Sequence, residues 1–306
     1  GPMEVGILGF KGGKKFWGGI GQTLADAIKL LTKEDILPKD SDKFLMILAP
    51  FIIFSGAFLT FIALPFAQNI VISDFNIGLF YIVAMSSVGV IGIILAGWSS
   101  NNKWSLYGAM RAAAQIISYE IPIGLSLLLV VIVSGSLHLG DIVQWQETNR
   151  WFIFHSPFAF LAFFIYFIST VAETNRTPFD IPEAESELVA GWMTEYSGFR
   201  WALFFLSEYA NMLIVCIVAS IVFLGGWLSP LHIINIFPES WYILDGPALG
   251  FFWVSLKAVI LIFVMMWFRW TFPRLRVDQL MYVCWKVFIP FALANLFFVS
   301  LWELIF

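Results

Sequence analysis

The sequence predicts an all-α fold, a polytopic bundle of transmembrane helices. Of its 306 residues, 60% are apolar, 18% aromatic and only 12% charged, whereas about 25% of residues are charged in a soluble domain. Seven stretches are long and apolar enough to cross a hydrocarbon core of roughly 30 Å. They are residues 44–66, 78–98, 121–139, 154–172, 201–227, 251–270 and 284–305. We therefore expect one integral membrane domain over residues 1–306.

The Lys and Arg residues predict which connections share a side of the membrane. Seven lysines lie within residues 1–43, before the first expected span, and fifteen of the 17 basic residues fall on alternate connections. Positive charge is enriched on the cytoplasmic side of membrane proteins. We therefore expect residues 1–43 and the connection at residues 173–200 on the cytoplasmic side.

Two stretches on this side have helical periodicity but are too polar to span. Within residues 1–43, apolar residues recur at helical spacing, which predicts an interfacial amphipathic helix along the membrane surface. The recurring residues are Ile20, Leu24, Ile28 and Leu31. The second stretch is residues 107–119, where alanines surround Arg111 and Gln115.

The connection at residues 173–200 begins with a dense acidic segment. Residues 172–188 hold five carboxylates and one arginine between two apolar segments. Asp180, Pro182 and Glu183 match a capping box, which predicts that a helix starts there. Acidic residues at the positive end of a helix are one explanation. Proton handling, cation handling and docking of another subunit are the alternatives.

Four ionisable residues fall inside or at the ends of expected spans: Glu120, Glu173, Glu208 and Lys257. An ionisable group at membrane depth is a functional hypothesis by default, because burying charge there is costly. Burial and mutual repulsion favour protonated carboxyls, so the acids could exchange protons. Snorkelling side chains or structural pairs are the alternative, and Lys257 could simply reach a neighbouring helix.

Other sequence features exclude several classes of function. A net charge of −4 argues against nucleic-acid binding. Cys216 and Cys284 lie in apolar runs without ligand spacing, so we expect packing residues and no metal site. His138, His155 and His232 lie in or beside connections on the opposite side, where a surface role is expected. The chain itself is expected to hold no redox cofactor.

Three long motifs resemble a known family. They are SNNKWSLYGAMRAAAQIISYEIP at residues 100–122, AETNRTPFDIPEAESEL at 172–188 and RWTFPRLRVDQLM at 269–281. In their order and over nearly the whole chain, the sequence resembles the H-type membrane subunit (mitochondrial subunit 1) of respiratory complex I, the proton-pumping NADH:quinone oxidoreductase. That family has eight spans, and the turn after its first span is similar to residues 1–6. We therefore favour a chain lacking the first span over an N-terminal tag remnant, although Met3 and Glu4 replace the Asn-Arg often found in this turn.

The resemblance implies a heel subunit in the membrane arm. It implies a quinone entrance, a quinone-chamber wall and an acidic path that couples quinone reduction to proton translocation. The implied proton path is Glu120, Glu173, Asp180 and Glu208. The implied chamber and coupling-loop residues are Asp26, Arg176, Glu183, Glu185, Glu187, Glu195, Arg274 and Arg276.

The resemblance also implies partners and a location. Quinone is the expected substrate, and the iron–sulfur clusters and FMN are expected in partner subunits. The expected partners are the peripheral-arm subunits with the terminal iron–sulfur cluster and quinone headgroup site, neighbouring membrane-arm subunits, and lipid. The expected location is a bacterial inner (cytoplasmic) membrane or an organelle inner membrane, with the acidic loop on the cytoplasmic or matrix side.

Two other functions stay open from the sequence. The chain resembles, in a wider sense, the membrane anchor of a related hydrogenase or of a quinone oxidoreductase with another electron donor. A stand-alone cation or solute transporter is disfavoured because no internal repeat or broken-helix signal is present.

Overall fold

The computed structural model describes residues 20–68, 70–181, 190–230 and 247–305. Within these ranges the fold is helical and contains no strand, only one isolated bridge between Ala67 and Ile70. Six helices are long and apolar enough to cross a membrane, and a seventh apolar helix, α7 (Pro157–Glu173), is shorter. These helices confirm the predicted all-α membrane bundle.

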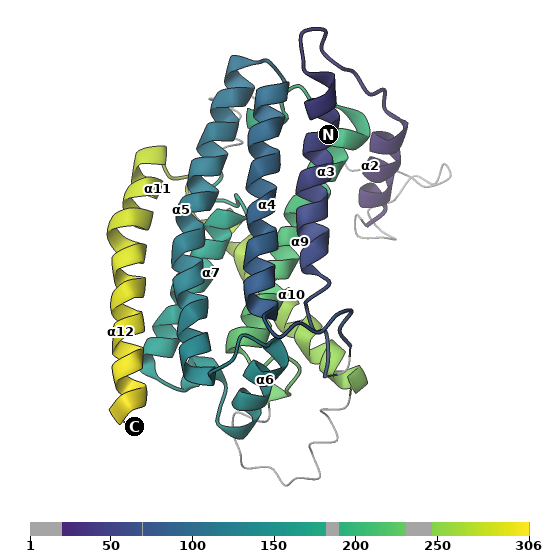
Figure 1. Ribbon diagram of the computed structural model, residues 1–306. Helices are drawn as coiled ribbons and strands as arrows, with labels where there is room; N and C mark the ends of the chain where they lie inside the picture. The colour runs from purple at the N-terminus through teal and green to yellow at the C-terminus, as the bar shows by residue number, and fades with distance from the viewer. Residues whose placement is uncertain (1–19, 69, 182–189, 231–246, 306) are drawn as a thin grey trace.

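The apolar helices run alternately up and down the bundle (Figure 1). In chain order, they are α3 (Lys43–Thr60), α4 (Gly78–Ser99), α5 (Lys103–Ser134), α7, α9 (Gly198–Phe223), α10 (Pro247–Thr271), and a final helix made of α11 (Val277–Val283), the π-helical turn η6 (Cys284–Phe288) and α12 (Ile289–Ile305). Short loops, two small α-helices and two 3₁₀ turns complete the described part: α2 (Ile20–Thr32), α6 (Leu139–Thr148), η2 (Phe152–Phe154) and η3 (Gly191–Met193).

The two ends of the bundle collect the connections that the charge pattern assigned to opposite sides. We call them the α2 end and the α6 end, after the small helix that each carries (Figure 1). At the α2 end, the amide of Asp42 donates to the carbonyl of Ser99 at 3.0 Å. At the α6 end, the amide of Leu79 donates to the carbonyl of Leu137 at 3.1 Å.

Helix α5 differs from the prediction. The polar stretch at residues 107–119 is not a separate helix but the first part of α5, which continues for 32 residues, about 48 Å at 1.5 Å per residue. Of the two polar side chains that suggested a break, Gln115 is 2% exposed and bonds to Ala172 near the end of α7, whereas Arg111 bonds to Tyr107 one turn earlier in α5. Pro122 lies within α5 without ending it.

The other predicted elements fit more closely. Helix α2 confirms the expected amphipathic helix, and its apolar residues Ile28 and Leu31 are exposed. Helix α6 was not predicted, and the last helix begins at Val277 rather than at residue 284. The helix expected to start near Asp180 lies outside the described residues.

Small residues bring the helices close together. A Cβ atom built on Gly97 of α4 would lie 2.3 Å from the Cβ of Ala109 on α5, and one on Gly92 would lie 2.3 Å from a side-chain carbon of Ile53 on α3. Close backbone approach through small residues is typical of packing between membrane helices. Helices α3, α4 and α5 are therefore closely packed at these positions.

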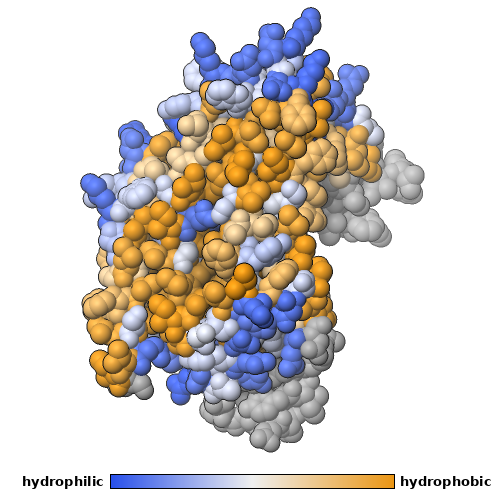
Figure 2. Space-filling model, in the orientation of Figure 1, coloured by the Kyte–Doolittle hydropathy of each residue, from blue (hydrophilic) through white to orange (hydrophobic). Residues whose placement is uncertain are grey.

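The outer surface is apolar around the middle. Figure 2 shows hydrophobic side chains across the centre of the visible face and hydrophilic ones toward its ends. Large apolar side chains on α10 and α12 are exposed, among them Phe263 at 67%, Trp267 at 62% and Phe291 at 64%. Such a surface suits lipid or neighbouring membrane subunits.

Candidate functional site

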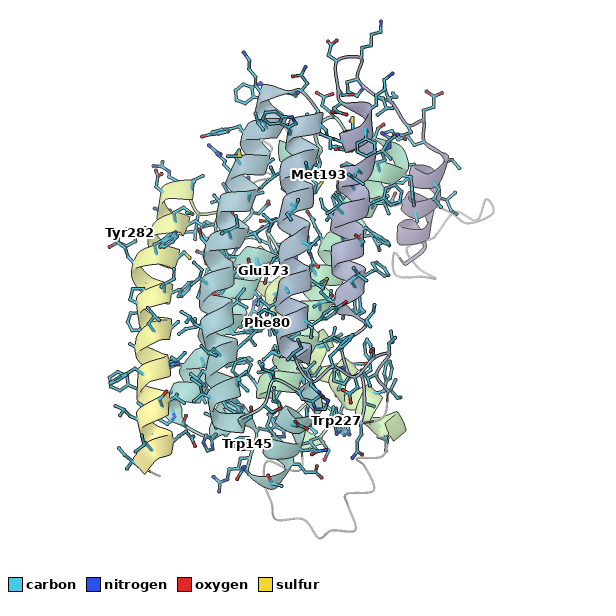
Figure 3. The ribbon with its side chains drawn as sticks, viewed as in Figure 1. Phe80, Trp145, Glu173, Met193, Trp227 and Tyr282 are labelled. Carbon is cyan, nitrogen blue, oxygen red and sulfur yellow. The ribbon has the colours of Figure 1, made fainter. Side chains whose placement is uncertain are left out.

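Glu173 and Glu208 line the same internal cavity. Its volume is about 40 Å³, room for a few water molecules. The polar lining also includes Ser86, Asn175 and Ser207, and the apolar walls come from α3, α4, α5 and the short helix η3 (Gly191–Met193). Figure 3 shows Glu173 within the bundle, between Met193 toward the α2 end and Trp227 at the α6 end. The structure thus brings two predicted proton-path residues together.

Local structure explains why these two carboxylates face one space. Helix α7 ends at Glu173, where Thr174 caps it and donates its hydroxyl to the carbonyl of Thr170 at 2.9 Å. Glu208 lies in the first half of α9, next to the fully buried Ser207. One carboxylate therefore comes from a helix end and the other from a helix interior.

Glu120 lies beside this cavity rather than in its lining. It is half-buried on α5 and accepts a hydrogen bond from the hydroxyl of Ser87 on α4. Helices α5 and α7, which carry Glu120 and Glu173, pack against each other. Three of the four predicted proton-path residues are therefore neighbours.

Asp180, the fourth predicted proton-path residue, lies in the connection at the α2 end. Its Oδ2 atom is 3.0 Å from Nη2 of Arg274. Nearby, the amide of Leu275 donates to the carbonyl of Pro178 at 3.0 Å. Two residues predicted from separate motifs thus form an ion pair that joins the turn after α7 to the segment before α11.

Arg176 projects from the same turn toward α9. Its guanidinium carbon is 4.6 Å from the ring centre of Tyr209, a cation–π distance. Its Nε and Nη2 atoms are buried and have no hydrogen-bond acceptor among the described residues. A buried guanidinium favours an anion or a carbonyl oxygen as partner.

The remaining predicted site residues are dispersed. Glu195 accepts a hydrogen bond from Nδ2 of Asn102 at 2.7 Å. The neighbouring Tyr196 hydroxyl lies 3.0 Å from Oγ of Ser99, and burial raises the pKa of Tyr196 to about 12. Asp26 is exposed on α2, and Arg276 is exposed at the start of α11. Glu183, Glu185 and Glu187 lie outside the described residues.

Lys257 does not join the carboxylates. Its ammonium donates to the carbonyls of Leu224, Gly226 and Leu228 at the α6 end. This contact agrees with the expectation that its long side chain reaches a neighbouring helix. In the described part of the chain, the polar side chains that line the cavity are therefore acids and neutral groups, without this lysine.

The two described histidines and the two cysteines do not line the cavity. His138 contacts Asp74 and Asp141, and His155 contacts Glu303, all at the α6 end. Cys216 and Cys284 are buried free thiols. The described residues contain no group of three or more His, Cys, Asp or Glu side chains suited to a metal ion. His232 lies outside the described residues.

Sequence reasoning missed several neutral polar residues of the site. Ser86, Asn175, Ser207 and Asn211 line the cavity, and Ser87 bonds to Glu120. Four of them could have been recognised from the sequence as polar residues inside strongly apolar stretches: Ser86, Ser87, Ser207 and Asn211. Such residues on membrane helices usually face the bundle interior.

Known proteins are similar to the chain over almost its full length. The NADH dehydrogenase family model matches residues 1–300. The H-type subunit of NADH-quinone oxidoreductase from Chlorobaculum tepidum is 52% identical over 99% of this chain and 82% of its own length. Its counterpart from Bacteroides fragilis is 51% identical over 92% of the chain and 77% of its own length, and that from Geobacillus sp. is 50% identical over 98% and 83%. The chain therefore belongs to the NADH dehydrogenase family and is a membrane subunit of an NADH-quinone oxidoreductase.

Proposed function

We propose that this subunit couples quinone reduction to proton movement through the cavity shared by Glu173 and Glu208. Glu120 extends the acidic group toward α4, and Asp180 extends it toward the α2 end. The observation that carries the proposal is the shared cavity, which combines two carboxylates with space for water. Carboxyls and water molecules in contact can pass protons between one another.

The coupling follows from charge. Reduction of a quinone to a quinol takes up two electrons and two protons. Before the protons arrive, the electrons add negative charge to the quinone, so a nearby acidic group experiences a changed field during the reaction. Because the carboxyls interact, a proton gained or lost at one changes the proton affinity of the next. This interaction links the quinone site to the membrane arm as a coupling free energy.

The quinone entrance and part of the chamber wall are proposed at the α2 end. Arg176, Arg274, Arg276 and Asp26 would contribute charged groups there, and Glu183, Glu185, Glu187 and Glu195 would belong to the coupling loop. Electrons would come from FMN and iron–sulfur clusters in partner subunits. The partners would be the peripheral-arm subunits that hold the quinone headgroup site and the neighbouring membrane-arm subunits.

The orientation belongs to the same proposal. The basic residues near the α2 end favour the cytoplasmic side of a bacterial inner membrane, or the matrix side of an organelle inner membrane. Lipid would cover the apolar middle of the bundle. The names of the relatives favour a quinone enzyme over the anchor of a hydrogenase.

The test uses the assembled complex with Glu173→Gln and, separately, Glu208→Gln. Each variant keeps the shape of the side chain but removes the titratable proton. We expect NADH:quinone turnover and proton pumping to fall about tenfold or more, while NADH oxidation by ferricyanide stays unchanged. Glu147→Gln, an exposed site on α6, is the control. Full quinone turnover and pumping in both cavity variants would reject the proposal.

A further inference from the structure

Gln115 of α5 holds the turn that follows α7. Its side chain is buried, with 2% of its surface exposed. The Nε2 atom donates to the carbonyls of Ala172 and Phe179, both at 2.8 Å, and to Oδ1 of Asn175 at 3.2 Å. The two N–H bonds of a single amide group from another helix thus lie within reach of three acceptors in residues 172–179, so one of the bonds is shared.

The turn's own backbone also bonds the two carbonyls: the amide of Asn175 donates to Ala172 at 3.2 Å and that of Ile181 donates to Phe179 at 2.9 Å. The last carbonyls of a helix have no intrahelical partner, and Ala172 is next to the final residue of α7. The chain then reverses through Asn175, whose φ of 51° is left-handed, a conformation that Asn tolerates better than most residues. A buried amide group without acceptors is costly, so the bonds of Gln115 to these carbonyls hold the turn in place against α5.

The turn has an acidic residue at each end, Glu173 and Asp180. Glu173 and Asn175 line the cavity with Glu208. Asp180, which directly follows Phe179, pairs with Arg274 at 3.0 Å. Because Glu120 is on α5 as well, Gln115 ties Glu173 to the helix that holds Glu120.

We propose that Gln115 is a positioning residue for proton exchange, which sets the distances from Glu173 to Glu120 and Glu208. This inference rests on the proposed function of those acids. The amide of Gln115 does not titrate, so its contribution is geometric. Displacement of the turn would change the interactions among the carboxyls and with them the pH range in which they exchange protons.

The experiment is Gln115→Met in the assembled complex. Methionine has nearly the same length but no donor. With a water-soluble quinone we expect kcat to fall by up to about a hundredfold, the cost that a displacement of about 1 Å can have, while KM stays within about twofold. The pH profile of turnover should shift from that of the wild type. NADH oxidation by ferricyanide should stay unchanged.

Gln146→Met is the matched control. Gln146 is also a buried glutamine, 1% exposed, and it braces the α6 end through the carbonyl of Ile221 at 2.9 Å and the amide of Gly225 at 2.9 Å. We expect this variant to lose thermal stability but to keep the wild-type pH profile. A wild-type kcat and pH profile in Gln115→Met, or an equal shift in Gln146→Met, would show that Gln115 has no specific positioning role.

A second variant decides the matter if Gln115→Met fails to assemble. Asn175→Gly keeps the left-handed backbone and removes the Oδ1 acceptor of Gln115, together with the amide group that lines the cavity. A smaller fall in kcat with the same direction of pH shift supports the inference, and wild-type behaviour overturns it. Glu173→Gln and Glu208→Gln separate the positioning role from the proposed function. If both acid variants are fully active, the proposed function is rejected. If the acid variants are impaired but Gln115→Met behaves as the wild type, only the positioning role is rejected.

Discussion

The ammonium of Lys257 lies 2.6 Å from the carbonyl oxygen of Leu224, the C-cap of α9. The carbonyls of Gly226 and Leu228 lie at 2.8 and 2.7 Å, and the ring centre of Trp151 at 4.2 Å. A cation at the C-terminal end of a helix is favoured by the helix dipole. The left-handed Gly225 and Gly226 continue the chain through this group. A lysine that is 6% exposed is thereby stabilised as part of the helix end.

The first prediction follows from this arrangement. Lys257→Met removes one N–H donor from each of three carbonyls, two in buried contacts and one in a partly buried contact. The free energy of unfolding of the complex-bound subunit should fall by about 1–3 kcal/mol. Thermal unfolding of the purified complex in detergent measures this loss. Lys286→Met is the control, because Lys286 is exposed and lies over the ring of Tyr282 at 4.8 Å, a contact worth about 1 kcal/mol or less. Equal losses in both variants would contradict the special role of the buried lysine.

The second prediction concerns pH and the cluster of His138, Asp74 and Asp141 at the α6 end. Nε2 of His138 is 2.6 Å from Asp74, and Nδ1 is 3.0 Å from Asp141. Burial lowers the pKa of His138, but the hydrogen bonds and charges of the two aspartates outweigh it and raise that pKa above its ordinary value of 6.5. A hydrogen bond from Ser136, together with His138, lowers the pKa of Asp141 despite some burial.

The sign of the effect follows from linkage. Because the folded pKa of His138 is raised, its stabilisation is fully present below about pH 6.5 and is lost as the pH rises through the folded pKa. Thermal stability of the wild type should therefore fall above pH 6.5. His138→Gln should flatten this part of the curve, and Asp74→Asn should reduce its slope. The aspartates are exposed, so salt should weaken the effect; a slope that survives in His138→Gln would contradict the assignment.

The sequence predicted the elements that depend on local composition. Long uninterrupted apolar stretches predicted the helices that contain residues 44–60 and 78–98. The placement of Lys and Arg on alternate connections predicted which connections lie at the same end of the bundle. The sequence did not predict the continuity of α5, because the environment of Gln115 depends on acceptors 57 or more residues away. Similarly, the resemblance marked Asp180 and Arg274 as charged site residues, but only tertiary packing pairs them across 94 residues.

The last prediction tests how tightly α5 is packed against the helix that covers the cavity. A Cβ on Gly108 would lie 2.7 Å from Cα of Gly191 and 3.0 Å from the amide nitrogen of Trp192. Since these atoms belong to backbone, they cannot rotate away. Gly108→Ala should therefore push η3 from α5, and with it Trp192, which lines the cavity.

We expect Gly108→Ala to lower the free energy of unfolding by about 1–3 kcal/mol, the usual cost of overpacking, and to lower quinone turnover through the displaced cavity wall. Gly124→Ala is the control on the same helix, because a Cβ there would meet no atom within 4 Å. It should change stability by no more than about 1 kcal/mol. Thermal unfolding and quinone turnover of both complexes measure the difference. Equal stability and equal quinone turnover in the two variants would mean that η3 can move away from α5 at little cost and that this contact does not set the shape of the cavity.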